Sequence, residues 1–488
     1  MTTRTSELTS RDASWSGLRV VVAGIGVSGF AAADALLERG AHVTVVDGLA
    51  PRDGSASAER ARILDILGAT LLLGPGRTGG LPPGDWDLVV TSPGWRPDQP
   101  LLAEAAAGGI PVWGEVELAW RMRPSEGAAP WLTVTGTNGK TTTVKMLTSI
   151  LRAAGLRACA AGNVGTPILQ AVLDPDPYDV IAAELSSFQL HWSSSIAPRA
   201  SACLNVAPDH IDWHGSFESY AAAKGVVYAR TEVACIYNVE DPLTERLVED
   251  AEVQEGCRAV GFTLGIPAPS MVGLVDGVLA DRAFIEQRTH NAAELATVAD
   301  LGGDPPPHYV ANALAAAALA RAHGVPAWAV RDGLRAFRPD PHRIADVATI
   351  DGVRFVDDSK ATNPHAAAAS LGAYPHVVWV AGGLLKGADV DGLVVAAAAR
   401  LRGVVLIGAD RQRIAAALAR HAPDVPVIDI ADTDTDVMDL VVSRAVDLAH
   451  PGDVVLLAPA AASMDMFTDY AERGDAFAEA VHRHSRGE

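Results

Sequence analysis

The chain has 488 residues and a mass of 50.8 kDa, which at roughly 150 residues per domain corresponds to about three domains. Hydrophobic residues make up 49% and charged residues 20%, a composition that excludes a largely disordered chain. The formal net charge of −20 argues against DNA wrapping or coating of anionic lipid, so phosphate-bearing ligands need local devices such as helix N-termini, single lysines and metal ions.

The cysteine content and the apolar runs of the chain indicate the cellular compartment in which we expect the protein. The four cysteines form no C-x-x-C pair, so neither a zinc ribbon nor a disulfide scaffold is indicated. The first 15 residues hold no apolar stretch of signal-peptide length, and the alanine-rich run 310–320 is too short to span a bilayer. We therefore expect a cytoplasmic monomer with neither nucleic acid nor membrane as a partner.

The first third of the chain alternates short apolar runs with helical stretches. Residues 18–24, 42–47 and 87–94 are typical of strands, and residues 30–40 are typical of a helix that ends at Gly40. Strands that alternate with helices predict a parallel sheet, because each crossover must pack back onto it. The polar stretch 123–130 (RPSEGAAP) predicts a linker.

A second pattern of strands and helices starts at residue 131. Strands are predicted at 131–136, 179–185, 199–206 and 233–238, and helices at 141–155, 217–230 and 308–324. A D-G turn between apolar runs within residues 270–284 predicts a hairpin. The proline-punctuated segment 338–343 (RPDPHR) predicts a second linker.

The last third opens with another hairpin signal, around Asp351 and Gly352. Strands at 376–383, 403–408 and 453–460 follow, with helices between them, and no fixed-period repeat suggests a solenoid. The sequence therefore predicts an α/β fold of three consecutive domains, at residues 1–127, 128–338 and 339–488.

A G-x-G-x-x-G pattern, from Gly24 to Gly29, follows the first strand and opens a helix. In that position backbone N–H groups face a pyrophosphate at the helix N-terminus, and Asp47 ends the next strand as a ribose-binding acid would. A nucleotide diphosphate fits this pattern as well as NAD does. The alternative is a tight packing turn that binds no ligand.

The segment GTNGKT at residues 136–141 follows a strand and precedes a helix. Its glycines allow the loop to wrap a phosphate, Lys140 can reach terminal phosphates, and the Thr141 hydroxyl can hold Mg²⁺. The loop is shorter than the common P-loop, which has a glycine where this chain has Val134. A merely solvated lysine is the alternative, and the strand–loop–helix context disfavours it.

Other polar residues lie after predicted strands, where ligands bind in parallel sheets, on predicted helices (Lys224 and Asn312) or at the second linker (Arg343). Glu184 suits Mg²⁺ coordination but equally a helix cap or salt bridge. Taken singly, His210 would be structural and Lys224 solvated, while Asn312 would make a helix–helix hydrogen bond. Arg343 suits a phosphate clamp or a junction salt bridge. The segment DDSKATN at 357–363 is dense in acids and hydroxyls, with a helix cap as its alternative.

In combination these motifs resemble the Mur ligase family of ATP-dependent amide-forming enzymes. The resemblance covers nearly the whole chain, in order: the first glycine pattern with SPG, GTNGKT, GNVGTP, ELSSFQL, NVAPDHID, the helix lysine, NALAA, PHR, DDSKATN, AGGLLKG, and PAAASMDMF with ERGDAF. ELSSFQL and DSKATN are most similar to the member that joins D-glutamate to UDP-N-acetylmuramoyl-L-alanine. The resemblance implies Rossmann-like first and third domains around a central P-loop-type ATPase sheet.

The resemblance also implies a role for each matched residue. The catalytic group would be Lys140, Glu184, His210 and Lys224. ATP would be held by Gly136, Thr137, Asn138, Gly139, Lys140, Thr141, Thr142, Asn312, Arg343 and Asp358. Two Mg²⁺ ions would be held by Thr141, Glu184, His210 and Lys224, the last as a carbamate. The UDP-linked substrate would meet Gly26, Ser28, Ser92, Gly94, Asn163, Ser186 and His210, and D-glutamate would meet Lys360, Thr362, Lys386, Ser463 and Met464.

Four positions depart from the family pattern. Tyr309 stands where an asparagine near ATP is expected, Gly48 replaces a polar residue after Asp47, and Trp213 and His214 have no assigned role.

The expected chemistry is phosphoryl transfer from ATP to the acyl carboxylate, which makes an acyl phosphate, followed by attack of the glutamate amine with His210 as a candidate base. The alternatives are another amide ligase of the family such as a folylpolyglutamate synthase-like enzyme, an NAD-dependent dehydrogenase, and a nucleotide-binding regulatory module without turnover.

Overall fold

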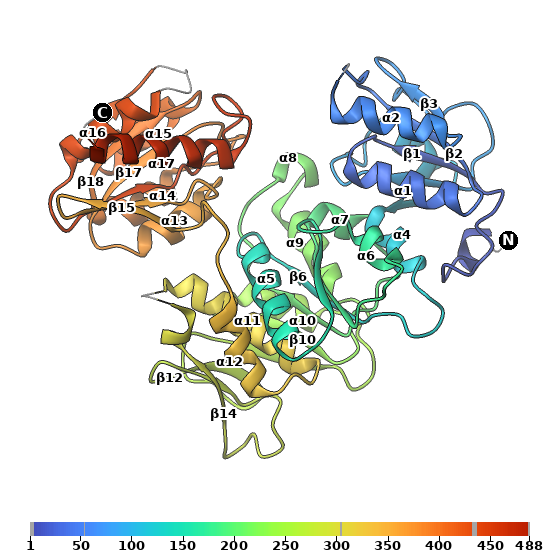
Figure 1. The fold of residues 1–488 in the computed structure, drawn as a ribbon, viewed down its shortest axis with the longest axis horizontal. Coiled ribbons are helices and arrows are strands. Elements are labelled where there is room, and N and C mark those ends of the chain that lie inside the picture. Colours follow the sequence, from blue (N-terminus) through green and yellow to red (C-terminus); the bar gives the residue numbers. More distant parts are fainter. Residues whose placement is uncertain (1–3, 53, 303–304, 432–436, 487–488) are drawn as a thin grey trace. The chain divides into compact units, whose positions relative to one another are not determined.

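The computed structural model of the protein describes residues 4–52, 54–302, 305–431 and 437–486; residues 1–3 and 487–488, at the ends of the first and third predicted domains, lie outside it. The chain groups into two compact units, Met1–Pro305 with Tyr309–Phe337, and Pro306–His308 with Arg338–Glu488. The boundary predicted near residue 127 falls inside the first unit, so the division into three domains stays a prediction. The described residues form three sheets, which confirms the predicted α/β class (Figure 1).

The first sheet is fully parallel, with the strand order β3-β2-β1-β4-β5. Its strands are β1 (Arg19–Ala23), β2 (His42–Asp47), β3 (Thr70–Leu73), β4 (Leu88–Thr91) and β5 (Val112–Gly114). The accompanying helices are α1 (Val27–Glu38), α2 (Ala56–Ile66), α3 (Pro100–Ala107) and α4 (Glu115–Arg121), after a 3₁₀ turn at Arg4–Glu7. Helix α1 begins three residues before the predicted start, because Gly26 already serves as its N-cap.

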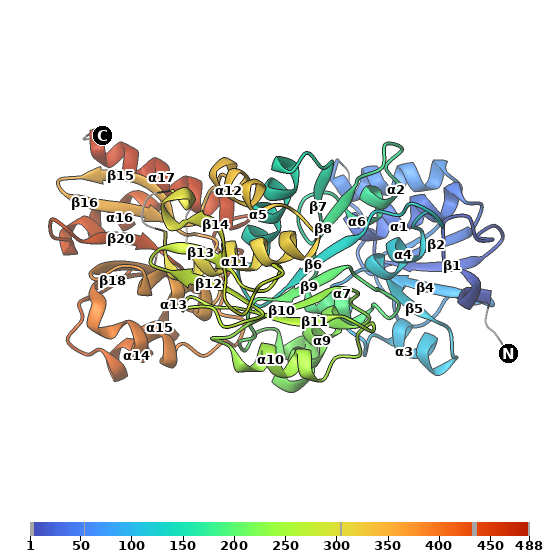
Figure 2. The ribbon, with the colours of Figure 1, turned by 90° about the horizontal axis from the view of Figure 1, so that it is seen from below.

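The central sheet has the order β14-β13-β12-β11-β10-β9-β6-β8-β7 (Figure 2). Its strands are β6 (Trp131–Thr135), β7 (Ala158–Gly162), β8 (Val180–Glu184), β9 (Ala200–Cys203), β10 (Ala234–Asn238), β11 (Arg258–Phe262), β12 (Met271–Val275), β13 (Val278–Asp281) and β14 (Ala293–Thr297). Pairing is parallel as far as β12, and β13 and β14 are antiparallel. The predicted D-G hairpin joins β12 to β13, with positive φ at both Asp276 and Gly277 as a tight hairpin turn requires.

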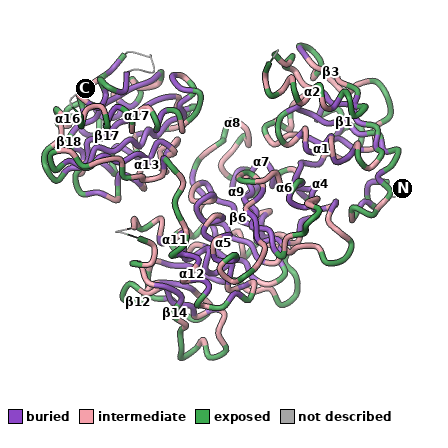
Figure 3. The backbone as a smooth tube through the Cα atoms, in the orientation of Figure 1, coloured by how far each residue is buried: buried purple, intermediate pink, exposed green. Residues whose placement is uncertain are grey.

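The helices of this region are α5 (Lys140–Ala153), α6 (Ile168–Leu173), α7 (Ser187–His191), α8 (Ile211–His214), α9 (Phe217–Gly225), α10 (Pro242–Glu249), α11 (Pro307–Ala322) and α12 (Ala327–Ala336). Helix α9 is shorter than the predicted 217–230, because the chain tightens into a 3₁₀ turn at Val226–Tyr228. A further 3₁₀ turn covers Val298–Leu301. All the alanines of α11 except the partly buried Ala311 are buried, which explains the composition of that run (Figure 3). None of the described helices combines the length and apolar character needed to cross a membrane.

The second unit holds the third sheet, with the order β15-β16-β20-β17-β18-β19. Its strands are β15 (Ala345–Ile350), β16 (Val353–Asp357), β17 (Val377–Gly382), β18 (Leu401–Ile407), β19 (Val427–Asp429) and β20 (Val454–Leu457). Its helices are α13 (Pro364–Gly372), α14 (Asp391–Ala397), α15 (Arg411–His421), α16 (Val437–Leu448) and α17 (Tyr470–Arg486), with a 3₁₀ turn at Ala398–Arg400. The predicted hairpin is present: β15 and β16 are antiparallel, while the other strand pairs are parallel.

A glycine in α12 makes this packing testable. A Cβ atom on Gly333 would lie 2.3 Å from Ile150 Cα and 2.6 Å from Ile150 N, so α12 could accept it only by moving off α5. We expect Gly333→Ala to lower the free energy of unfolding by about 1–3 kcal/mol. The control is Gly392→Ala in α14, where a Cβ meets no atom within 4 Å and where alanine favours the helix. Calorimetry of both variants is the measurement, and an unchanged melting temperature for Gly333→Ala would contradict the packing.

Candidate functional site

The GTNGKT loop lies between β6 and α5. Gly136 has a φ of +152° and Gly139 a φ of +83°, conformations that side-chain-bearing residues rarely adopt. The loop backbone is fixed from the next strand connection, because Thr137 N donates to Asn205 O (2.9 Å) and Asn138 N donates to Asn205 Oδ1 (2.8 Å). The first turn of α5 therefore starts from a rigid loop, an arrangement suited to binding phosphate.

Two lysines meet at one carbonyl of this loop. Lys140 Nζ donates to Gly136 O (2.8 Å) and Thr137 O (2.9 Å), and Lys224 Nζ, from α9, also donates to Gly136 O (2.8 Å). Lys224 is 2% exposed and lies over the Tyr220 ring. Burial, and next the positive charge of Lys140, lowers the pKa of the Lys224 amine to about 7. The loop thus gathers cationic groups where an anion would bind.

Glu184 ends β8 with one oxygen unsatisfied. Its Oε1 accepts a hydrogen bond from Asn163 Nδ2 (2.9 Å), while Oε2 is buried and accepts none. The neighbouring backbone is tied as well, since Asn163 N donates to Glu184 O (2.9 Å). A buried carboxylate oxygen without a donor is unfavourable unless a cation satisfies it, and carboxylate oxygen is a preferred ligand of Mg²⁺. Glu184 therefore fits a metal ligand.

His210 and the unassigned residues after it form an aromatic group. His210, with a φ of +52°, caps α8, and its ring meets the Phe188 ring at 4.7 Å between centroids. The His210 side chain is 43% exposed, but desolvation by its neighbours still lowers its pKa, so its imidazole is mostly neutral at pH 7. His214 Nε2 lies 3.0 Å from Ser187 Oγ, and burial lowers the pKa of His214 to about 4. Trp213 packs against Phe188, so these two departures from the family pattern are explained by packing.

Within the described residues, no group of three or more His, Cys, Asp or Glu side chains could hold a metal ion by itself. The predicted set contains two such side chains, Glu184 and His210, together with the Thr141 hydroxyl and Lys224. An unmodified lysine is a donor and a cation. Lys224 could therefore act as a metal ligand only if it became an anion.

Asn312 in α11 packs directly on the glycine loop. Its side chain is buried, and a Cβ on Gly139 would lie 2.3 Å from Asn312 Oδ1, so loop and amide fit closely. Tyr309, one turn earlier, pairs its ring with Phe337 at 6.2 Å. Tyr309, which replaces the expected asparagine, thus forms an aromatic pair about one turn before Asn312 in the same helix.

In the first sheet the glycine pattern wraps tightly around Ser92. A Cβ on Gly29 would lie 1.9 Å from Gly24 O, and one on Gly24 would lie 2.5 Å from Ser92 Oγ. Ser92 Oγ is buried and has no hydrogen-bond partner, so this loop holds an unsatisfied polar atom where a ligand is expected. Gly26 admits a Cβ freely and Gly94 is exposed, as a backbone open to a ligand would be.

Three nearby residues already make internal contacts. Asp47 accepts from Ile25 N (3.0 Å) and Leu49 N (2.9 Å) with its two carboxylate oxygens, so it holds the glycine loop in place and the predicted ribose contact gains no support. Ser28 lies beside the buried carboxylate of Glu115. Ser186 is the N-cap of α7, in a capping box with Gln189.

The second unit carries the remaining predicted residues. Asp358 is buried, accepts from Ile344 N (3.3 Å) and contacts Ser370, and burial raises the pKa of its carboxyl to about 7. Lys360 Nζ donates to Tyr470 OH (2.9 Å), and Thr362 N donates to Lys360 O (2.8 Å). Arg343 Nε lies 4.0 Å from Asp340 Oδ2. Ser463 is buried, whereas Met464 beside it is 61% exposed. Lys386 is exposed and has a φ of +50°.

The sequence interpretation missed several polar residues that hold these motifs in place. Arg473, which is 1% exposed, donates to Ser359 O (2.8 Å) and Ala461 O (3.1 Å) and so joins the DDSKATN and PAAAS segments. Its signal was the ERGDAF match, which carried no role. Glu115 and Glu117, both buried in α4, gave no motif signal.

Comparison with known proteins agrees with this geometry. The Mur ligase middle domain matches residues 134–320, and the Mur ligase glutamate ligase domain matches residues 342–461. A UDP-N-acetylmuramoylalanine–D-glutamate ligase from Streptomyces avermitilis is 62% identical over 96% of this chain and 98% of its own, and the one from Mycolicibacterium smegmatis is 47% identical over 95% and 96%.

Solved structures share the fold at low identity. The UDP-N-acetylmuramate–alanine ligase from Thermotoga maritima has a TM-score of 0.55 at 18% identity, covering 96% of this chain and 100% of that one. The MurF ligase from the same organism, in complex with ADP, has a TM-score of 0.54 at 16% identity, covering 98% and 99%. With both domain matches and relatives at this identity along almost its whole length, the chain belongs to the Mur ligase family.

Proposed function

We propose that the protein is an ATP-dependent ligase that adds D-glutamate to UDP-N-acetylmuramoyl-L-alanine, forming an amide in peptidoglycan precursor synthesis. The observation that carries this is the 62% identity, over 96% of the chain, to a relative with that activity in its name. We propose further that it acts in the cytoplasm as a monomer of three domains, and that its product supports cell shape and division.

The first step activates the acyl carboxylate, because a carboxylate does not react with an amine at neutral pH. An oxygen of the alanyl carboxylate attacks the γ-phosphorus of ATP, the bond to ADP breaks, and an acyl phosphate forms. The rigid loop at 136–139 and Lys140 hold the phosphates, and Asn312, Arg343 and Asp358 complete the ATP contacts. In this role Lys140 exchanges its carbonyl partners for phosphate oxygens.

The residues around Glu184 fit a divalent cation. Glu184 Oε2 is the buried oxygen without a donor, and Thr141, His210 and a carbamate on Lys224 would complete two Mg²⁺ sites. When bound, such ions neutralise the charge that develops on the transferred phosphoryl group. The chain's own contribution is to hold these ligands at adjacent strand ends, with Asn163 fixing the other Glu184 oxygen.

The second step needs D-glutamate as a free amine. His210 is our candidate base, because its lowered pKa keeps the imidazole mostly neutral, and in this step its free ring nitrogen must accept a proton instead of binding Mg²⁺. The amine nitrogen then attacks the acyl carbon, and the tetrahedral intermediate collapses to the amide and phosphate. Lys360 and Lys386 suit the two carboxylates of glutamate, with Thr362, Ser463 and Met464 beside them. Gly26, Ser28, Ser92, Gly94, Asn163 and Ser186 would hold the UDP-linked substrate.

The stereochemistry of the acceptor tests the function directly. With ATP, Mg²⁺ and UDP-N-acetylmuramoyl-L-alanine, we expect phosphate release with D-glutamate at least roughly 100-fold faster than with L-glutamate, as a site built for one arrangement of two carboxylates discriminates strongly. Phosphate release is measured with both isomers, and with a pteroate acceptor plus L-glutamate as the control for a folate-type ligase. Turnover with the pteroate pair alone would refute the assignment, as would nicotinamide reduction without any phosphate release.

Removing the Lys224 side chain tests its role as an anion. We expect Lys224→Ala to lower kcat by roughly 100-fold or more, because it deletes a group that holds charge-neutralising metal. Formate or acetate should restore part of the activity by supplying a carboxylate in the space left by the side chain. Lys145→Ala, on α5, is the matched control and should respond to neither change. An undiminished Lys224→Ala enzyme would reject the carbamate.

The lowered pKa of Lys224 predicts when the carbamate forms. Only the neutral amine combines with CO₂, and with a pKa of about 7 most of Lys224 is neutral at pH 8, whereas protonation dominates as the pH falls below 7. With ¹³C-bicarbonate we expect a carbamate carbon resonance that is strong at pH 8 and much weaker at pH 6. A spectrum of wild-type protein without this resonance at pH 8, or one in which Lys224→Ala retains it, would contradict the prediction.

A further inference from the structure

Helix α4 carries two buried carboxylates that none of the steps above uses. Glu115 is 3% exposed and Glu117 is 0% exposed. The helix begins at Gly114, whose N–H donates to Trp192 O (3.1 Å), and a Cβ at this position would lie 3.0 Å from Trp192 Cβ. Acidic side chains are almost never fully buried without partners, so the partners of these two show what α4 holds.

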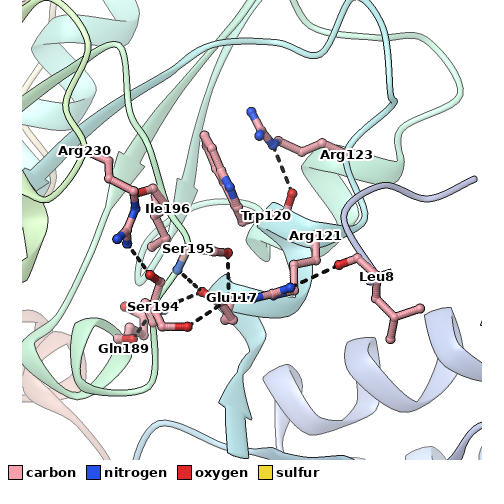
Figure 4. Close-up of polar contacts among 11 residues, drawn as sticks. Leu8, Glu117, Trp120, Arg121, Arg123, Gln189, Ser194, Ser195, Ile196 and Arg230 are labelled. Atoms are coloured by element: carbon pink, nitrogen blue, oxygen red, sulfur yellow. Dashed lines mark hydrogen bonds and ion pairs between the residues drawn. The ribbon is translucent and has the colours of Figure 1, made fainter. Parts of the chain in front are cut away.

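Glu117 is bonded on both oxygens to one turn of the central region (Figure 4). Its Oε2 accepts from the backbone N of Ser194 (2.8 Å) and Ser195 (2.9 Å). Its Oε1 accepts from Ser195 Oγ (2.6 Å), Ser194 Oγ (3.2 Å) and Arg121 Nε (2.7 Å). Burial disfavours the charge, but these donors outweigh it and hold the pKa of Glu117 below its usual value. The bonds fix the turn in direction as well as in distance.

That turn is a continuation of the ELSSFQL motif. Glu184 ends β8, Ser186 caps α7, and Ser194 and Ser195 follow the end of α7. Arg230 holds the other side of the turn, with Nε donating to Ile196 O (3.2 Å) and a further bond to Ser194 O (Figure 4). The turn that follows the Glu184 motif and helix α7 is therefore clamped between α4 and the segment that follows Lys224.

Glu115 reaches the other side of the same junction. Its side chain lies beside Ser28, within the first glycine pattern, and accepts from the backbone N of Leu169 (3.4 Å) at the start of α6. Helix α6 follows the GNVGTP segment, which contains Asn163. One short helix thus contacts the glycine pattern of the first sheet, the segment after Asn163 and the segment after Glu184.

We propose that α4 is a positioning element for the reaction, in which Glu117 and Glu115 set the distance between the bound sugar nucleotide and the phosphoryl-transfer residues. The inference rests on the proposed function, which requires the alanyl carboxylate, held from the first sheet, to meet the γ-phosphate, held by the central sheet. Reacting atoms must come within about 3–3.5 Å and in line, so a small rotation between the two sheets lowers the rate strongly. An apolar contact of the same area would hold the two regions together but would not fix their orientation.

The decisive variant is Glu117→Gln. It keeps the shape of the side chain but replaces one acceptor oxygen by an NH₂ group that faces N–H or O–H donors. We expect kcat to fall roughly 10-fold to 100-fold, while the Kd values for UDP and for ADP, measured separately by calorimetry, stay within about twofold of wild type. Each nucleotide meets one side of the junction, so loss of alignment affects the reaction and not the separate binding steps.

Asp281→Asn is the matched control. Asp281 is also 0% exposed and accepts from two backbone N–H groups, of Ala283 (2.7 Å) and Phe284 (2.9 Å), and from Arg321 Nε (2.9 Å). It lies on β13 and takes no part in the α4 junction. We expect it to lower the melting temperature as Glu117→Gln does, but to leave kcat per folded molecule unchanged.

The outcomes separate this inference from the proposed function. If wild-type protein releases no phosphate with its three substrates, the proposed function fails. If wild type is active and Glu117→Gln has the same kcat per folded molecule, or loses UDP or ADP binding in proportion to its rate, the positioning role is overturned. Should Glu117→Gln not fold, Ser195→Ala decides, because it removes the 2.6 Å bond and keeps the charge: a lower kcat with unchanged Kd values supports the role, and an unchanged kcat refutes it.

Discussion

The carbonyl oxygen of Gly136 is the constraint on which the central site depends. It accepts hydrogen bonds from Lys140, the first residue of α5, and from Lys224, which lies 88 residues after Gly136 in the chain. Gly136 must be glycine, because its φ of +152° is unfavourable for other residues and a Cβ would press on Leu204 at 3.1 Å. A chain with a net charge of −20 thus brings two lysine side chains to one backbone oxygen: Lys140 is a cation for phosphate, and Lys224, in our proposal, becomes the carbamate that holds Mg²⁺.

Sheet topology places the other groups around that carbonyl. Strands β8, β6 and β9 are neighbours and parallel, so their carboxyl ends share one edge. Glu184 ends β8, the glycine loop leaves β6, and Asn205 follows β9 and holds the loop backbone. The buried, unpaired Glu184 Oε2 and the lowered pKa of Lys224 result from this crowding. The unpaired carboxylate oxygen and the buried amine both lower the stability of the fold when no ligand is bound. Both become useful when a phosphate and a cation are bound.

Much of the fold and of the candidate site could be predicted from local sequence. Parallel strands are apolar throughout, glycines mark positive φ, and polar residues at strand ends mark the ligand edge, so most of the strands, both D-G hairpins and the position of the glycine loop followed from short segments. Six of the strands that the structure describes were not predicted, namely β3, β5, β7, β11, β14 and β19. The helix at 217–230 was predicted too long, because a 3₁₀ turn follows Gly225, a residue of low helix propensity.

Contacts between residues that lie far apart in the sequence could not be predicted from the sequence. Glu117 pairs with a turn some 77 residues away, and an acid in a short helix has no pattern that distinguishes it from a solvated one. Arg473 and Ser359, bonded at 2.9 Å, are separated by 114 residues. The Asp47 carboxylate had the position of a ribose ligand, and only the structure shows its two oxygens bonded to backbone N–H groups. The roles assigned through family resemblance stay predictions until ligands are bound.

The central claim is that ATP cleavage is coupled to amide formation through an acyl phosphate made on the alanyl carboxylate. The most direct measurement uses substrate labelled with ¹⁸O in both oxygens of that carboxylate and follows the label by mass spectrometry. Our account predicts that each phosphate released carries one ¹⁸O atom, since the bridging oxygen leaves with phosphorus, and that the amide keeps the other. Phosphate without label, formed at the same rate as the amide, would contradict it.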